Sequence, residues 1–483
     1  MAKFFGLNLS RSNKYLTNFI ESYAQDASQT KKNQLTIRLI LFSITFFILT
    51  SLFLVILGKS WFNFQAINPF LNIYGVVVTG VLFMNFIITF IYYKDPYIEV
   101  KNFKLKSGTK PLFASIMVAV FNEEEIIKRC LDSLVNQSYQ YKEVIVVNDC
   151  STDGTAKILD EYSLYHDIKV IHLPNNMGKK KALAQAMLNA NGEIFAFTDS
   201  DSILAEDAIE KIVKIFEHTP SVGGVSGHSR VLNADTNLLT KMQDAWYEGQ
   251  FSIRKAYESI FGAVTCVSGP LAVFRKATIY NYIPAWENDQ FLGQEFKFAT
   301  DRTLTGFTLG CTTIGAKLKK KYADSPFVTQ VNYPEREWRV VYSKSARALT
   351  HVPDTFKRII KQQIRWKKSF IRNTFFTGHF FWKKAFPVAF VYYLHILFVF
   401  AGPFIFFRHL IYLPFHGDML SAIVYLMGIA YIGFLFGLAY KIEDRSSSFW
   451  IYRPLMSLLS TLVLSWLIFY SMVTIKKMTW SRA

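Results

Sequence analysis

Two aspartates, Asp199 and Asp201, stand one residue apart directly after a short apolar run. Paired carboxylates bind hard divalent cations, and Mg²⁺ keeps few protein ligands and takes the rest from water and phosphate. A cation held there would neutralise a departing diphosphate as a Lewis acid. Asp-x-Asp also occurs by chance in solvated loops and helix caps. The apolar run before the pair and a second acidic turn upstream favour the metal site.

Two more polar turns, Asn122–Glu123 and Asn148–Asp149, each follow a run rich in valine and isoleucine. Carboxylates at such places hydrogen-bond a ribose or the edge of a base, and the same residue types also form turns and cap helices. We expect both roles, with Glu123 and Asp149 facing a nucleotide. Lys179 opens the next helical stretch. A helix N-terminus with an ammonium group suits phosphate, although lysine on a solvated helix face is the commoner case.

A further aspartate, Asp301, stands in the short motif Thr300-Asp301-Arg302. A hydroxyl group is a poor nucleophile until a base takes its proton, and one carboxylate suffices for direct displacement with inversion. A lone aspartate in such a motif usually decorates a surface. Its position downstream of the acidic pair favours the catalytic interpretation.

The segment 362–366, Gln-Gln-Ile-Arg-Trp, lies in a helical stretch close to apolar segments. Trp366 is suited to stack on a sugar ring, and Arg365 to bind diphosphate oxygens in a bidentate manner. The alternative is an aromatic and basic membrane anchor, which is common beside apolar segments.

Between residues 111 and 370 short apolar runs alternate with amphipathic stretches. Repeated strand–helix–strand units predict a mostly parallel sheet with helices on both faces, and ligands bind beyond the carboxyl ends of such strands. Asn122, Asp149 and Asp199 would then share one edge. The predicted strands are 112–120, 143–147, 168–172 and 194–198, and the predicted helices are 123–136, 155–162, 179–189 and 205–218.

The composition predicts a mixed membrane and globular protein, because the 483 residues are 51% hydrophobic and 16% aromatic. The formal net charge is +18, and the lysines cluster beside apolar segments. A membrane surface and phosphate-bearing substrates are therefore expected, and no pattern typical of nucleic-acid binding is present.

The apolar segments predict five domains along the chain: an interfacial segment at 1–34, two spans within 35–95, a soluble domain at 111–370, an interfacial helix at 371–385 and about three spans within 386–476. Basic residues flank the first two spans on their outer sides. The positive-inside rule then predicts a multi-pass protein of the plasma membrane with its soluble domain in the cytosol. Lys476 and Lys477 disagree with this rule, because five spans would place the C-terminus and these basic residues outside.

The longer runs 223–227, 266–271, 301–305 and 362–370 resemble those of processive family 2 glycosyltransferases, and most of all those of hyaluronan synthases. The resemblance covers about residues 113–372 and the flanking spans. Chitin synthases of the nodulation type and cellulose synthases share the scheme less closely. The resemblance implies a GT-A-like α/β domain with a Rossmann-like nucleotide half, placed between transmembrane helices that form a channel for the polymer.

The resemblance also implies roles for individual residues. Asp301 would be the base, and Asp201 with Asp199 would hold Mg²⁺ or Mn²⁺. The donor would contact Asn122, Glu123, Asp149, Lys179, Asp199 and Arg365. The acceptor would contact Cys266, Ser268, Gly269, Pro270, Gln362 and Trp366.

Three departures bear on the product. Thr300 stands where the family usually has a first acidic residue, His228 stands where hyaluronan synthases carry an aspartate, and the stretch 311–336 is extra. They weaken the prediction of hyaluronan as the product more than the prediction of glycosyl transfer.

We therefore expect metal-dependent, inverting transfer from a UDP-sugar, UDP-GlcNAc with or without UDP-GlcA, to a growing β-linked polysaccharide that leaves through the bilayer. One alternative is transfer of a single sugar to a lipid carrier. Another is a sugar-binding pseudo-enzyme.

Overall fold

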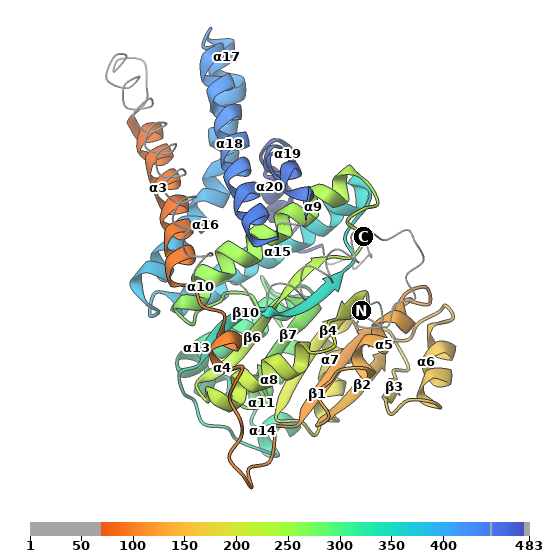
Figure 1. Cartoon of the computed structure of the whole chain (residues 1–483). Helices are drawn as coiled ribbons and strands as arrows, with labels where there is room; N and C mark the ends of the chain where they lie inside the picture. Colours follow the sequence, from red (N-terminus) through yellow and green to blue (C-terminus); the bar gives the residue numbers. More distant parts are fainter. Residues whose placement is uncertain (1–68, 445–446, 478–483) are drawn as a thin grey trace.

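The computed structural model describes residues 69–444 and 447–477. An eight-stranded sheet with the order β3-β2-β1-β4-β7-β6-β10-β5 forms its centre (Figure 1). The strands are β1 (Ala114–Val120), β2 (Lys142–Asn148), β3 (Lys169–His172), β4 (Ile194–Asp199), β5 (Ser202–Leu204), β6 (Val222–Val231), β7 (Ala272–Arg275) and β10 (Arg339–Thr350). A small hairpin, β8 (Gln290–Phe291) and β9 (Gln294–Glu295), stands apart from it.

The half of the sheet from β3 to β4 is parallel, and it confirms the predicted strands. Ile116 and Val118 of β1 pack into one buried cluster, whereas Met117 packs into the cluster on the opposite face. Burial on both faces explains the continuous apolar runs in the sequence. The connecting helices are α5 (Ile127–Val135), α6 (Thr155–Ser163), α7 (Lys179–Leu188) and α8 (Ala208–His218). The GT-A-like α/β fold expected from the sequence is thereby confirmed.

The other half of the sheet is mixed, because β7 pairs antiparallel with both β4 and β6, while β10 pairs parallel with β6 and antiparallel with β5. The prediction did not include these strands. Strand β6 is buried along its whole length although it contains glycines, serines, a histidine and an arginine. A Cβ atom at Gly227 would overlap the Leu271 side chain. Close packing therefore requires glycine there, and the sequence consequently lacks the apolar pattern by which a strand is predicted.

A layer of helices lies across one end of the sheet, between the sheet and the apolar helices (Figure 1). It contains α9 (Leu238–Gly249), the π-helical turn η2 (Gln250–Lys255), α10 (Ala256–Ile260) and α15 (Phe356–Phe381). Helix α13 (Thr300–Lys321) packs against α15. Gly306 and Gly310, one turn apart in α13, face the rings of Phe376 and Phe380 in α15.

Helix α15 runs unbroken to Phe381, so residues 371–381 continue it and do not start a separate interfacial helix as the sequence suggested. The extra stretch 311–336 forms the second half of α13, the short helix α14 (Pro326–Thr329) and a return to β10. The side chain of Asn281 ties this return to the domain by donating to the Phe327 and Val331 carbonyls at 2.7 and 2.6 Å.

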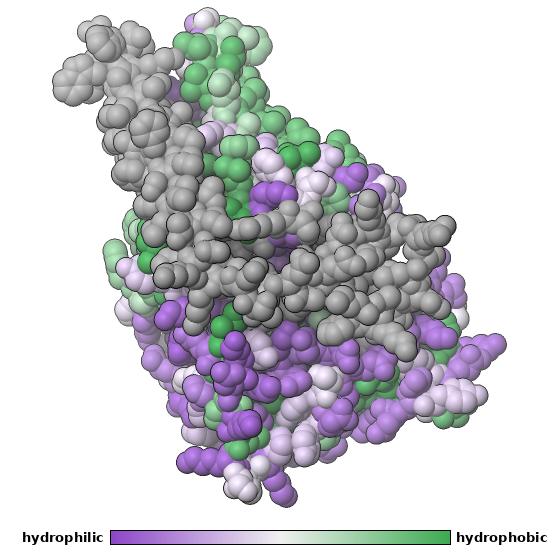
Figure 2. Space-filling view, in the orientation of Figure 1, coloured by the Kyte–Doolittle hydropathy of each residue, from purple (hydrophilic) through white to green (hydrophobic). Residues whose placement is uncertain are grey.

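The apolar helices extend away from the sheet, and Figure 2 shows hydrophobic side chains gathered on α17 (Leu413–Phe415) and α18 (Met419–Glu443), above a mostly hydrophilic lower part. Three stretches, Phe386–Phe415, Met419–Ile442 and Phe449–Val473, are long and apolar enough to cross a membrane. They lie within residues 386–476, where the sequence predicts about three spans. Helix α3 (Pro69–Tyr92) covers the second predicted span, whereas the predicted segment 1–34 and the first span lie outside the described residues.

Replacing Gly310 with alanine should destabilise the protein. The new Cβ would lie 2.6 Å from a ring carbon of Phe380, which is buried. Overpacking of this kind costs about 1–3 kcal/mol, more than the helix propensity that alanine gains. Gly428→Ala is the matched control, because no atom of residues 69–444 and 447–477 lies within 4 Å of that Cβ position. The thermal unfolding midpoint in detergent should fall for Gly310→Ala alone, and equal midpoints for the two variants would contradict the close packing of α13 on α15.

Candidate active site

The carboxyl ends of β1, β2 and β4 lie side by side, as predicted. Val120 pairs with Asn148, and Ala119 pairs with Asp199. Asn122 and Cys150, in the turns that follow β1 and β2, have positive φ angles of 54° and 60°. Residues other than glycine seldom adopt this conformation, and such strain is typical of functional turns.

A cavity of about 1250 Å³ opens at this edge of the sheet. Its walls come from the turns after β1, β2 and β4, the start of α7, the helix layer, the loop before β7, and the first turn of α13. The structure thus brings together every residue that the sequence suggested. These residues are Asn122, Glu123, Asp149, Lys179, Asp199, Asp201, Cys266, Ser268, Gly269, Pro270, Asp301, Gln362, Arg365 and Trp366.

The acidic side chains at the predicted nucleotide end also hold the turns in place. Asp149 accepts hydrogen bonds from the backbone N–H groups of Met177 and Gly178, at 2.6 and 2.8 Å, and so fixes the loop before Lys179. Burial raises the pKa of Asp149, and these two hydrogen bonds oppose the shift. Glu123 accepts from the Ser200 hydroxyl at 2.7 Å, which joins the first turn to the Asp-Ser-Asp turn.

The Asp199–Asp201 pair concentrates negative charge in the cavity. Burial and the neighbouring Asp199 carboxylate raise the pKa of Asp201 to about 6. The Lys179 ammonium group forms an ion pair with Asp199. Burial lowers the pKa of Lys179, but the carboxylates of Asp199, Asp301 and Asp201 together outweigh this effect, so the pKa lies above its ordinary value. The guanidinium of Arg365 is a second cation on which Asp199 and Asp201 act electrostatically.

Asp301 lies in the first turn of α13, where the helix dipole favours a negative charge. Its Oδ2 atom accepts from the backbone N–H of Gly269 at 3.2 Å and lies 3.6 Å from the Cys266 Sγ atom. Ala299, directly before the helix, has φ 63° and ψ 37°. This left-handed residue turns the chain so that α13 begins at the cavity wall.

Aromatic rings line the part of the cavity near α15. The indole of Trp366 stacks on that of Trp246, with ring centroids 5.8 Å apart and an interplanar angle of 23°. Trp246 and Tyr247 of α9 line the cavity, and the sequence analysis did not single them out. Two adjacent aromatic residues on an amphipathic helix were the available signal, but a buried core position explains such a pair equally well.

Two of the departures from the family pattern now have a location. Thr300 lines the cavity and contributes no charge there, and its carbonyl accepts from the indole N–H of Trp286 at 2.9 Å. His228 is not a cavity residue. It is 2% exposed, its Nδ1 atom lies 2.6 Å from the Tyr342 hydroxyl, and its Nε2 atom lies 3.2 Å from Glu248.

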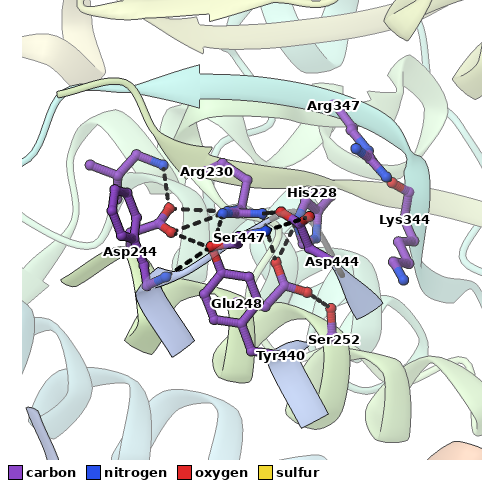
Figure 3. A network of polar contacts seen from close by, with 12 residues as sticks. His228, Arg230, Asp244, Glu248, Ser252, Lys344, Arg347, Tyr440, Asp444 and Ser447 are labelled. Atoms are coloured by element: carbon purple, nitrogen blue, oxygen red, sulfur yellow. Dashed lines mark hydrogen bonds and ion pairs between the residues drawn. The ribbon is translucent and has the colours of Figure 1, made fainter. Parts of the chain in front are cut away.

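His228 belongs to a buried polar network that joins the sheet to α9 and α18 (Figure 3). Arg230 of β6 donates to both carboxylate oxygens of Asp244 in α9, at 3.0 and 2.8 Å. It also contacts Asp444 at 3.3 Å and the ring of Tyr440 at 4.8 Å. Burial lowers the pKa of His228, and the Glu248 carboxylate opposes this shift. The replacement at position 228 is therefore structural.

A second buried cluster connects three parts of the cavity wall. Asp289 accepts from Lys180 of α7 at 2.9 Å and from Arg372 of α15. Lys180 also donates to the Phe296 carbonyl at 2.7 Å. The predicted nucleotide helix, the loop that leads to Asp301, and the helix that carries Trp366 are thus held together by one carboxylate.

Comparison with known proteins identifies the domain. Residues 115–282 match the family Glycosyl transferase family 2. They form a family 2 glycosyltransferase domain. The chain is 26% identical over 419 residues to a hyaluronan synthase of Streptococcus pyogenes serotype M3, covering 85% of this chain and 90% of that protein. It is 32% identical over 272 residues to an N-acetylglucosaminyltransferase of Rhizobium meliloti, covering 55% of this chain and 58% of that protein.

Among solved structures, a mannosyltransferase from Pyrobaculum calidifontis in complex with GDP-Man and Mn²⁺ matches with a TM-score of 0.43 and 18% identity, covering 80% of this chain and 97% of that one. The glycosyltransferase resembles hyaluronan synthases along most of its length, as the motifs suggested. The cavity described above lies at the edge of its family 2 domain, and the residues of α13 and α15 that complete the cavity lie beyond the matched range.

Asp289→Asn should destabilise the glycosyltransferase, because it leaves Lys180 and Arg372 buried without their counter-charge. Breaking a buried ion pair from one side costs about 3–5 kcal/mol. Asp167→Asn is the control, since Asp167 is an exposed aspartate. Chemical denaturation followed by tryptophan fluorescence should give a lower free energy of unfolding for Asp289→Asn only. An unchanged value would show that Asp289 does not hold the three segments together.

Proposed function

We propose that the enzyme is a membrane-embedded, processive, inverting β-glycosyltransferase. It polymerises UDP-sugars, UDP-GlcNAc with or without UDP-GlcA, and passes the polysaccharide through the bilayer. The observation that carries the proposal is the single cavity shared by the Asp199–Asp201 pair, Asp301 and Trp366. The names of the relatives, a hyaluronan synthase and an N-acetylglucosaminyltransferase, support the choice of donor.

The donor end lies at the turns after β1, β2 and β4. Asn122, Glu123 and Asp149 recognise the uridine, for which the hydroxyls of a ribose and the N–H of a base are suitable donors. Lys179 and Arg365 bind the diphosphate. The guanidinium of Arg365 can do this in a bidentate manner, whereas Lys179 acts as a point charge at the N-terminus of α7.

The donor set of the cavity fits a divalent cation. No group of three or more His, Cys, Asp or Glu side chains surrounds a metal-sized site within residues 69–444 and 447–477. Asp199 and Asp201 would therefore supply the protein ligands, and phosphate and water the others, which is the pattern that Mg²⁺ and Mn²⁺ tolerate. Burial and the repulsion from Asp199 both raise the pKa of Asp201, and a bound cation would relieve this repulsion. When bound, the cation supplies Lewis-acid stabilisation of the leaving diphosphate.

Asp301 is the general base of this mechanism. It takes the proton from an acceptor hydroxyl as that oxygen attacks the anomeric carbon, while the bond from this carbon to the UDP oxygen breaks. The attack comes from the face opposite to UDP, so the anomeric configuration inverts. The Gly269 N–H contact holds the carboxylate at the cavity wall, in the first turn of α13.

The acceptor end is formed by the loop 266–270 and by α15. Cys266, Ser268, Gly269 and Pro270 line it, together with Gln362. The stacked indoles of Trp366 and Trp246 provide an apolar face for a sugar ring. A clamp for the growing end favours repeated addition, since an enzyme that adds one sugar needs no such grip. The three helices beyond α15, which are long and apolar enough to cross a membrane, support a position of this end next to the bilayer.

Product length distinguishes the proposal from single-sugar transfer to a lipid. Purified enzyme with Mg²⁺ or Mn²⁺ and radiolabelled UDP-sugars should give long chains on a gel, and hydrolysis of the product should identify the sugars. Products that carry only one added sugar would favour the lipid-linked alternative. If no tested UDP-sugar leads to release of UDP, only a sugar-binding role would remain.

Asp301→Asn should lower the transfer rate by a factor of about 10² to 10⁴, the typical contribution of a general base. UDP binding should be unchanged, because Asp301 acts on the acceptor hydroxyl in this mechanism and is not among the residues that hold UDP. Asp324→Asn is the matched control, since Asp324 is exposed and follows the opposite end of α13. Initial rates and calorimetric UDP binding should be measured for all three proteins. Normal polymerisation by Asp301→Asn would refute the assignment of the base.

A further inference from the structure

Lys255 is a buried lysine on the wall of the cavity, and no role has been assigned to it above. It is 8% exposed and closes the π-helical turn η2 between α9 and α10. A π-helical turn is rare and frequently marks a functional position, because it displaces the following side chains from their helical register. Burying an ammonium group is costly, so its surroundings must show what compensates it.

The partners of the Lys255 ammonium group are neutral. It donates to the Ser226 hydroxyl of β6 at 2.9 Å and to the Ser268 hydroxyl, and it lies 4.1 Å from the centre of the Phe251 ring. Within residues 69–444 and 447–477, no carboxylate lies at ion-pair distance from it. Burial lowers the pKa of Lys255 to about 8, so the ammonium form still prevails at neutral pH.

The direction of these hydrogen bonds determines where the hydroxyl protons of the two serines can be donated. An ammonium group only donates, so both hydroxyl oxygens must accept from Lys255 and keep their own protons for other partners. The Ser226 hydroxyl donates to the Gly227 carbonyl at 3.3 Å. For the Ser268 proton, the described part of the chain offers no acceptor. Ser268 lines the cavity, and the next residue, Gly269, contacts Asp301.

We propose that Lys255 is a positioning residue that holds the Ser268 hydroxyl as a hydrogen-bond donor to an oxygen of the acceptor sugar. The inference rests on the proposed function and adds a specificity contact to it. The base accepts a proton from the attacking hydroxyl, and Ser268 beside it donates to another oxygen of the same sugar. Two neighbouring groups of opposite polarity select the orientation of the ring, because the reversed ring would leave both groups unpaired.

The test compares Lys255→Met, Ser268→Ala and the double variant. Loss of the oriented donor should lower kcat/KM for the acceptor by about 10-fold in each single variant. The donor KM and UDP binding should stay as in the wild type. The double variant should be no worse than the poorer single variant, because both changes remove the same contact. Ser268→Thr keeps the hydroxyl and should retain most of the wild-type kcat/KM for the acceptor.

Lys241→Met is the matched control, because it removes an ammonium group from α9 that lies over the Phe449 and Tyr452 rings and does not line the cavity. Wild-type kinetics in Ser268→Ala would overturn the inference. Equal losses of kcat/KM for the donor and for the acceptor in Lys255→Met would also overturn the inference, because they would indicate a lysine that only supports the fold. If Lys255→Met does not fold, the Ser268→Ala and Ser268→Thr pair still decides whether the Ser268 hydroxyl makes the contact.

Calorimetric binding of a β1,4-linked N-acetylglucosamine disaccharide separates this inference from the proposed function. Weaker binding to Ser268→Ala than to the wild type supports the contact, even if no donor sugar is transferred. Wild-type enzyme that releases no UDP with any sugar would instead refute the proposed function. Equal binding of the disaccharide by the wild type and Ser268→Ala would refute the contact alone.

Discussion

Three carboxylates, Asp199, Asp201 and Asp301, share one partly closed cavity, and their repulsion is the constraint to which the rest of the site responds. Like charges in a medium of low dielectric constant repel strongly unless cations stand between them. The chain supplies Lys179 beside Asp199, and Arg365 within the electrostatic reach of all three. The same cations suit a diphosphate. A site that balances its own acidic groups in this way is therefore also prepared for an anionic donor together with a divalent cation.

This balance between carboxylates and cations holds only if elements far apart in the chain stay fixed relative to one another. Parallel pairing aligns the ends of β1, β2 and β4, while α13 and α15 must be brought to that edge from elsewhere. Gly306 and Gly310 permit the close approach of these two helices, and Asp289 links both α7 and the loop before α13 to α15. Rigid elements hold reacting groups more accurately than loops do. Asp301 accordingly stands in the first turn of a helix of 22 residues.

The sequence predicted the half of the fold whose strands are apolar on both faces, and it missed the half whose strands are not. Strand β6 contains Gly227, His228 and Arg230, and no periodicity marks it as a buried strand. The candidate site was predictable because strand ends carry polar turns to one edge. Lys255 was not predictable, since a lysine in a helical stretch is usually solvated, and only its burial between Ser226 and the loop of Ser268 distinguishes it.

The buried network around Arg230 shows how the sheet and the apolar helices become one body. Arg230 stands on a central strand, yet its guanidinium contacts Asp444 and Tyr440 at the end of α18. Asp244 and Glu248 of α9 and Asp444 at the end of α18 all contact the Arg230 guanidinium, so a shift of either helix against the sheet would separate buried charges. The network therefore favours one relative position of sheet and helices. The proposed stepwise addition and export of a polysaccharide would require such a fixed distance between the cavity and the apolar helices. His228 belongs to the same network, because its ring links Glu248 of α9 to Tyr342 of β10.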